Sequence, residues 1–214
     1  MILTMQNAIL EPDEIAGRIA QQSLAKRGAD YASEVRRLLD AALTVMRERG
    51  TTSRPRVADI VGAAGLSNDA FYRHFSSKDA LVTALIDDGA TRLVSYLDHQ
   101  MAKEPTAERK IRRWVEGVLS QTDDEIAATT LAVLWNAGTA GEGVAAGRHF
   151  ASAPLGALLH DPFSALGSTD PELDSSLVAH AVLGKLSDYL WQRKRPSRAE
   201  VRAITGFCLR TVDK

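Results

Sequence analysis

A run of polar side chains in the N-terminal half has the composition needed to contact a nucleic acid. Tyr72, His74 and Lys78 offer a hydroxyl, a ring N–H and an ammonium group, all of which can hold phosphate oxygens. The amide of Asn68 can read an adenine base. On a helix, the side chains free to face outward would be Asn68, Asp69, Tyr72 and Arg73. This chemistry requires a helix that presents the run to a groove of DNA.

The surrounding residues predict two short helices joined by a tight turn. The first covers residues 57–64, and Gly65 stands where a helix end favours left-handed backbone. Ser67 can cap a second helix that runs through His74. This is the helix-turn-helix layout, in which the second helix enters the major groove. The inward-facing residues would be Val57, Ile60, Val61, Ala64, Ala70, Phe71 and Phe75.

The segment AGLSNDAFYRHFSSKDAL resembles the DNA-binding segment of the TetR family of bacterial transcriptional regulators. The likeness covers about residues 33–88 and includes the Gly-x-Ser turn, the Phe-Tyr-x-His-Phe core and the Ser-Lys-Asp-x-Leu continuation. It implies a homodimer in which each subunit has a three-helix DNA-binding head, a long fourth helix and an all-α ligand-binding body. In the family, the positions of Tyr72, His74 and Lys78 commonly hold the DNA backbone. In the family, the residues at the positions of Asn68, Asp69 and Arg73 vary with the operator that each member reads. Arg56 stands where many members have a Thr that binds phosphate.

Each of these side chains also has a purely structural explanation. Tyr72 could close the core of the small head, His74 could cap or pack, and Lys78 could be an ordinary solvated lysine. Asn68 and Asp69 could serve only to stabilise the first turn of their helix. Because two phenylalanines already fill the inward face, we favour phosphate contact for Tyr72.

Helical periodicity over nearly the whole chain predicts an all-α fold. One amphipathic helix ends near Gly50, and a fourth helix starts at a capping box of Ser76 and Asp79 and runs to about His99. Residues 1–30 are weakly periodic, and we expect a mobile arm with at most a turn or two of helix. Further helices are expected over 106–121, 124–146, 148–160, 171–194 and 197–212, with loops at Asp161–Pro162 and 167–171. The expected domains are the arm (1–30), the helix-turn-helix head (31–79) and an effector-binding and dimerisation body (80–214).

Composition excludes several other classes of protein. The 214 residues are 45% hydrophobic and 25% charged, which is ordinary for a globular protein. The net charge is −1 although residues 31–79 carry +2, so an architectural DNA-binding protein, which should be far more basic, is disfavoured. The single cysteine, Cys208, excludes an intrachain disulfide and fits a reducing compartment. The longest uncharged stretch, 126–141, is too short to cross a membrane, and we expect a cytoplasmic protein that does not contact membranes.

No catalytic or metal-binding pattern is present in the sequence. It contains neither a GxSxG elbow nor an HExxH helix, and its clustered glycines do not have phosphate-loop spacing. We therefore expect no enzymatic activity, no cofactor and no metal site. The alternative from another class is an all-α enzyme or ligand carrier with a helix-turn-helix-like N-terminus.

The middle helices carry large and amphipathic residues that could line a mostly apolar effector pocket, although each alone could equally belong to the core. The last two helices could close the core of the monomer, or pair with their two-fold copies as the family resemblance favours. We expect a dimeric repressor released from its DNA operator by a small, largely apolar ligand, with an activator as the alternative. The candidate ligand-binding residues are Trp114, Trp135, Asn136, His149, Phe150, Phe163 and Tyr189.

Overall fold

The computed structural model describes residues 12–137 and 152–211, and these parts of the chain are helical almost throughout and contain no strand. The predicted all-α fold is therefore confirmed. The first helices are α1 (Pro12–Arg49), α2 (Val57–Ala64), α3 (Asn68–His74) and α4 (Lys78–Met101). They are followed by α5 (Ala107–Leu119), the 3-10 turn η1 (Ser120–Thr122), α6 (Asp124–Ala137), a helical segment at 152–157, α8 (His160–Ala165), α9 (Pro171–Gln192) and α10 (Arg198–Arg210).

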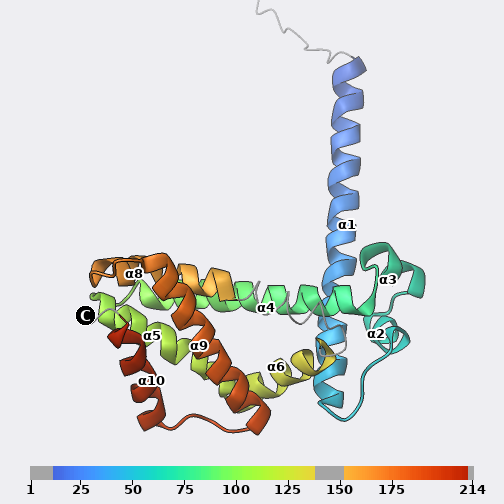
Figure 1. The fold of residues 1–214 in the computed structure, drawn as a ribbon. Coiled ribbons are helices and arrows are strands. Elements are labelled where there is room, and N and C mark those ends of the chain that lie inside the picture. Colours follow the sequence, from blue (N-terminus) through green and yellow to red (C-terminus); the bar gives the residue numbers. More distant parts are fainter. Residues whose placement is uncertain (1–11, 138–151, 212–214) are drawn as a thin grey trace, which may run out of the picture.

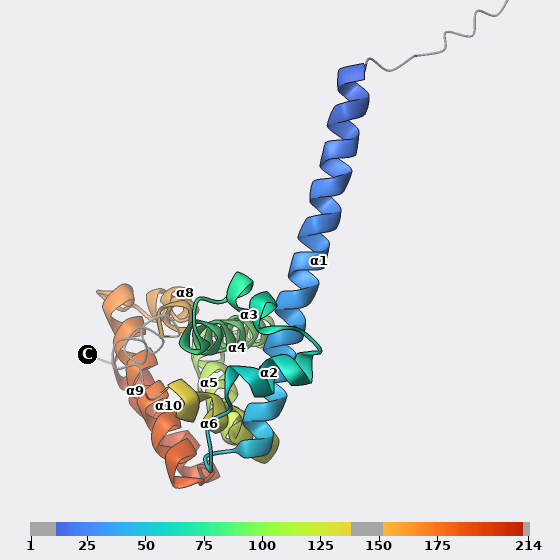
Figure 2. The same cartoon turned by 90° about the vertical axis from the view of Figure 1, so that its right-hand side faces the viewer.

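Helix α1 is much longer than the sequence pattern predicted. It begins at Pro12 and runs without a break to Arg49, and its N-terminal half stands clear of the rest of the molecule (Figures 1 and 2). The expectation of at most a turn or two of helix before residue 31 was wrong. Periodicity marks the face of a helix that packs against other elements. Residues 15–30 are all exposed, so this part of α1 has no apolar stripe to detect.

We call residues 31–79 the head, and they surround a small core to which a distant helix contributes. Leu38 of α1, Ile60 of α2 and Phe71 of α3 have no exposed surface and belong to one cluster. The same cluster contains Ala132 and Val133 of α6. The C-terminal half of α6 is therefore packed into the core of the head.

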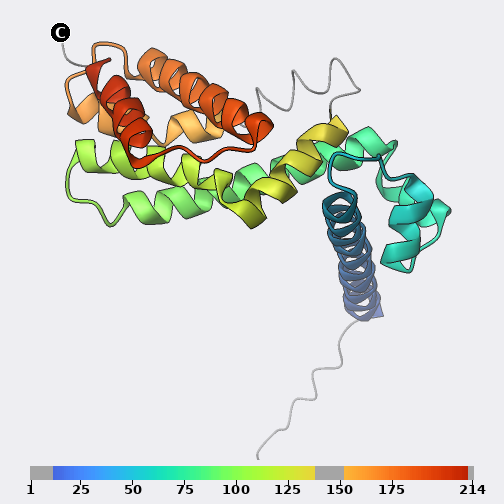
Figure 3. The same cartoon turned by 90° about the horizontal axis from the view of Figure 1, so that it is seen from below.

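We call the described residues from 80 onward (80–137 and 152–211) the body. Its helix α5 packs against α4, α8, α9 and α10 (Figure 3). Trp114 of α5 is fully buried and its Nε1–H donates to the backbone oxygen of Leu155 at 3.0 Å. Cys208 of α10 is also fully buried, and burial raises the pKa of its thiol to about 11. Cys208 is therefore a small buried residue and not a reactive thiol.

Helix α4 belongs to both cores. Its first half places Leu81 and Leu85 in the core of the head, and its second half places Leu97 and Met101 in the core of the body. Between these halves, none of residues 87–92 is buried. A shift of one half of α4 can therefore be passed to the other through a stretch of helix that packs little.

Two predicted boundaries need correction. Helix α4 is capped by Ser77, whose Oγ accepts from the backbone N–H of Ala80 at 3.1 Å, and not by Ser76. Asp161–Pro162 forms no loop, because α8 runs through it. A proline in the first turn costs no helical hydrogen bond, since those N–H groups have no partner within the helix.

Candidate nucleic-acid interface

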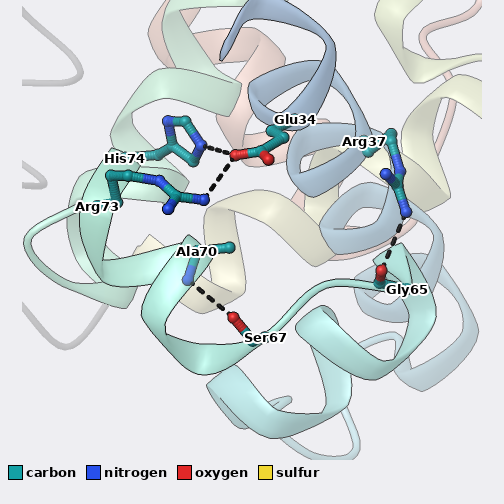
Figure 4. A network of polar contacts seen from close by, with 7 residues as sticks. All are labelled: Glu34, Arg37, Gly65, Ser67, Ala70, Arg73 and His74. Atoms are coloured by element: carbon teal, nitrogen blue, oxygen red, sulfur yellow. Dashed lines mark hydrogen bonds and ion pairs between the residues drawn. The ribbon is translucent and has the colours of Figure 1, made fainter. Parts of the chain in front are cut away.

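The turn between α2 and α3 has the geometry that the sequence predicted. Gly65 adopts φ +62°, a left-handed conformation that a glycine takes without strain. Ser67 caps α3, its Oγ accepting from the backbone N–H of Ala70 at 3.1 Å (Figure 4). Arg37 of α1 donates to the carbonyl oxygens of Ala64 at 2.6 Å and Gly65 at 3.1 Å. Helix α1 therefore fixes the turn from which the second helix starts.

Helix α3 presents one polar face to solvent. Ala70 and Phe71 are buried, whereas Asn68, Asp69, Tyr72 and Arg73 are exposed, as expected for a helix that enters a groove. Tyr72 is 59% exposed, and its ring meets Phe71 edge to face with centroids 5.2 Å apart. The phenol is thus held in place from behind while its hydroxyl is free to meet a phosphate.

His74 lies inside the head, and its predicted contact with the DNA backbone does not fit this position. Its side chain has no exposed surface, and its Nε2 lies 2.6 Å from Oε2 of Glu34 (Figure 4). Its ring also packs edge-on against Tyr31. The packing role that was the alternative for His74 describes what is seen. Arg73 shares the same carboxylate, with Nη2 at 2.9 Å from Oε2 of Glu34, but its side chain remains 57% exposed.

The carboxylate of Glu34 is stabilised in its charged form by this arrangement. The hydrogen bond with His74 is the largest cause of a lowered pKa for Glu34, followed by the hydrogen bond from Arg73. Glu34 therefore ties the last turn of α3 to α1 as an ionised group at neutral pH.

Lys78 and Arg56 lie at the starts of the two helices that flank α3. Lys78 is the first residue of α4, is half-buried, and donates from Nζ to the backbone oxygen of Pro55 at 3.4 Å. Arg56 is exposed at the N-cap of α2, and its backbone N–H donates to Asp59 Oδ2 at 2.7 Å. The guanidinium of Arg56 thus extends from a helix N-terminus, a position that attracts anions.

The body contains a cavity of about 1210 Å³ lined by α4, α6, α9 and the C-terminal end of α1. Its wall is largely apolar, with an aromatic pair, Trp135 and Trp191, whose ring centroids are 6.2 Å apart. A second cavity of about 260 Å³ lies beside it and shares Arg47 and Leu190 with it. Ligand pockets usually measure about 300–1,000 Å³, so the large cavity has room for a small molecule, whereas the small cavity falls below that range.

Of the residues expected to bind ligand, Trp135 lines the large cavity and Tyr189 the small one. Trp114, Asn136 and Phe163 are completely buried and line neither of these two cavities. The size and aromatic character of a side chain do not tell whether it lines a cavity or is buried in the core. The two remaining candidates, His149 and Phe150, lie outside the described residues.

Sequence reasoning missed the three arginines that line the large cavity, Arg47, Arg54 and Arg92. Arg54 lies in the loop between α1 and α2, where no periodicity indicates a direction. Its Nη2 donates to the backbone oxygen of Trp135 at 3.3 Å, and its Cζ lies 5.7 Å from the centre of the Trp135 ring system. No pattern in the sequence joins two residues that are 81 positions apart.

Within residues 12–137 and 152–211, no group of three or more His, Cys, Asp or Glu side chains could hold a metal ion. In the same ranges, no helix is both long and apolar enough to cross a membrane.

Comparison with known proteins places the helix-turn-helix in a family. Residues 38–85 match the bacterial regulatory proteins of the tetR family, which confirms the resemblance inferred from the sequence. No curated protein matches the chain. Among solved structures, a protein assigned to the TetR family from Mesorhizobium loti is 17% identical with a TM-score of 0.64, covering 85% of this chain and 96% of that one.

Two further structures with this fold contain ligands. FadR from Bacillus subtilis, in complex with stearoyl-CoA, is 15% identical with a TM-score of 0.58, covering 82% of this chain and 96% of that one. RolR, in complex with resorcinol, is 17% identical with a TM-score of 0.63, covering 86% and 89%. At such identities the likeness establishes a shared fold.

Proposed function

We propose that this chain, whose residues 38–85 and overall fold are those of the TetR family, is a cytoplasmic, ligand-responsive repressor of transcription. The observation that carries the proposal is the exposed polar face of α3, set on a turn that α1 holds by hydrogen bonds. A short helix fixed in this way can enter the major groove as a rigid unit.

The exposed residues divide by the DNA group each would meet. Tyr72, Lys78 and Arg56 would hold phosphates, and such contacts position the protein without recognising the base sequence. Asn68 and Arg73 would meet base edges, an amide being suited to adenine and a guanidinium to guanine. Asp69 fits a base contact only where a cytosine amino group can donate to it, because its charge repels phosphates. His74 is left out of this set because it is buried.

The large cavity supports the ligand-responsive part of the proposal. It is wide enough for a drug-sized molecule and is lined mainly by apolar side chains. The relatives solved with stearoyl-CoA and with resorcinol show that proteins of this fold accommodate ligands of very different size. We infer that an effector occupies this cavity here as well.

The last two long helices support a homodimer. One face of α9 and α10 closes the core of the body, but Leu173, Leu177 and Phe207 on other faces are each about half exposed. A two-fold axis through these residues would bury them against their own copies. The resulting dimer would present two α3 helices to two half-sites on the operator.

Release from DNA requires an effector that binds the DNA-incompetent spacing of the two heads more tightly than the competent one. Helix α4 is suited to carry this difference, since it joins the core of the head to the wall of the cavity. The coupling must be reciprocal, so operator DNA weakens effector binding by the factor by which the effector weakens DNA binding.

Selection of bound duplexes from a random pool tests the DNA-binding part directly. The selected site placed upstream of a reporter gene then tests repression against activation. Lower reporter expression when the protein is present supports a repressor, and higher expression overturns that part of the proposal.

A further inference from the structure

We propose that the effector of the large cavity is an amphipathic molecule with an apolar body and an anionic group, and that Arg54 binds the anion. This inference rests on the proposed function in that it names the chemical class of the ligand. The apolar body would lie against Trp135, Trp191 and the leucines of the wall, and the anion would lie at the junction of body and head.

Arg54 is held at the cavity by weak and replaceable contacts. Its guanidinium donates to one carbonyl oxygen at 3.3 Å and lies over the Trp135 ring system. Among the described residues it forms no ion pair, although it is partly buried. A ligand anion would replace the neutral carbonyl by a charge-assisted hydrogen bond, which is about twice as strong.

The charges on the cavity wall favour an anion at this end. Two of the charged side chains on the wall are neutralised by neighbours, Arg92 by Asp88 and Asp188 by Lys185. Arg47 and Arg54 form no ion pair in the part of the chain that the structure describes. The carboxylate of Glu125 also forms no ion pair among the described residues. It lies ten residues before Trp135 on α6, roughly 15 Å along the helix, and is therefore far from the Arg54 end of the cavity.

The adjoining small cavity strengthens the positive potential. Its wall includes Arg47, Arg193 and Lys194, with Arg195 engaged by Asp124 at 2.9 Å. Arg193 donates to the hydroxyl of Thr51 at 3.0 Å, so this basic group also lies where the body meets the head. A cation would meet repulsion here, whereas a carboxylate, sulfonate or phosphate would be attracted.

The position of Arg54 gives anion binding a direct route to the DNA-binding helices. Arg54 contacts Trp135, the carbonyl of Pro55 accepts from Lys78, and Arg56 caps α2. These three successive residues therefore link the cavity to the start of α4 and the start of α2. Drawing Arg54 toward a ligand would displace the segment that supports both helices.

A matched pair of fluorescent probes tests the inference on the full chain. 8-Anilinonaphthalene-1-sulfonate and N-phenyl-1-naphthylamine share one ring system and differ by the sulfonate. We expect one site per chain and an affinity about tenfold higher for the sulfonate, as a single charge-assisted hydrogen bond would give. Arg54→Gln should remove most of this difference while changing the affinity of the neutral probe less than about twofold.

Arg47→Gln serves as a second variant if Arg54→Gln lowers the melting temperature, and Arg112→Gln, an exposed change on α5, is the matched control. Equal affinities for the two probes, an equal effect of Arg54→Gln on both, or no binding of either probe would overturn the inference. Failure of the proposed function would be detected by a different experiment, the selection of DNA sites. If no DNA site is selected but sulfonate-selective binding depends on Arg54, the DNA-binding proposal fails and the ligand class stands.

Discussion

Glu34 of α1 and His74 of α3 are joined by a 2.6 Å contact between Oε2 and Nε2, and the His74 ring packs edge-on against Tyr31. This contact fixes the C-terminal end of the helix that we place in the DNA groove. The side chain of His74 has no exposed surface in this position. His74 would then act on DNA binding by positioning α3 and not by touching a phosphate.

The first prediction concerns Glu34 and pH. The pKa of Glu34 is lowered from its ordinary value of 4.5, so its contribution to stability is present above about pH 4.5 and is lost as the pH falls through its folded-state pKa. Glu34→Gln should therefore lower the free energy of unfolding at pH 7, and the gap to the wild type should narrow on acidification. Urea denaturation at several pH values measures this. Glu48→Gln, an exposed change on the same helix, is the control, and a gap that is constant with pH would refute the prediction.

The second prediction separates phosphate contacts from base contacts. Tyr72→Phe and Lys78→Ala should weaken binding about equally on selected and scrambled DNA, because phosphate contacts carry no sequence information. Loss of Lys78 should also reduce the slope of log affinity against log salt by roughly one unit. Titrations at several salt concentrations measure both effects, with Lys103→Ala on the body as control. Altered sequence preference with an unchanged salt slope would show that these residues are misplaced.

The third prediction concerns the middle of α4. Gly89 is exposed, and a methyl group added there would meet no atom within 4 Å, so Gly89→Ala should stabilise the helix by roughly 1 kcal/mol. A stiffer α4 should also change the factor by which an effector weakens DNA binding. Gly28→Ala, in open space on α1, is the matched control that should leave this factor unchanged. Equal effector responses in both variants would argue that α4 does not transmit the signal.

The fourth prediction concerns assembly. Leu177→Glu and Phe207→Glu place charges on the exposed apolar faces of α9 and α10, so each should shift the protein from dimer to monomer and weaken operator binding. Point substitutions are preferable to removal of these helices, because their other faces bury Val182 and Cys208 in the core. Sedimentation velocity measures the outcome, with Leu24→Glu on the exposed part of α1 as control. A dimer that persists in both variants would place the interface elsewhere.

The helix-turn-helix was predictable because its determinants are local. The left-handed turn needs Gly65, the cap needs Ser67, and α3 needs an apolar inner face within one turn of an exposed outer one. Each of these lies within a few residues of its partner. Local chemistry and tertiary structure agree here, and a sequence pattern is then sufficient.

The long start of α1 and the cavity were not predictable in the same way. Residues 15–30 are all exposed, so no periodic pattern of buried residues marks their helix. The cavity depends on how α6 lies against α1 and α4, which brings Arg54 to Trp135 and leaves Trp114 inside the core. Such arrangements follow from packing between distant segments, and single-residue properties such as size or charge do not reveal them.

The central claim is that two copies of α3 read a specific DNA site. Selection of bound sequences from a random duplex pool by the full chain tests it most directly. We expect enrichment of a two-fold pseudo-palindrome with half-sites one helical turn of DNA apart, or a multiple of it. The enrichment should be lost when Asn68 and Arg73 are both changed to Ala. A pool that remains unenriched by the wild-type protein would contradict the claim.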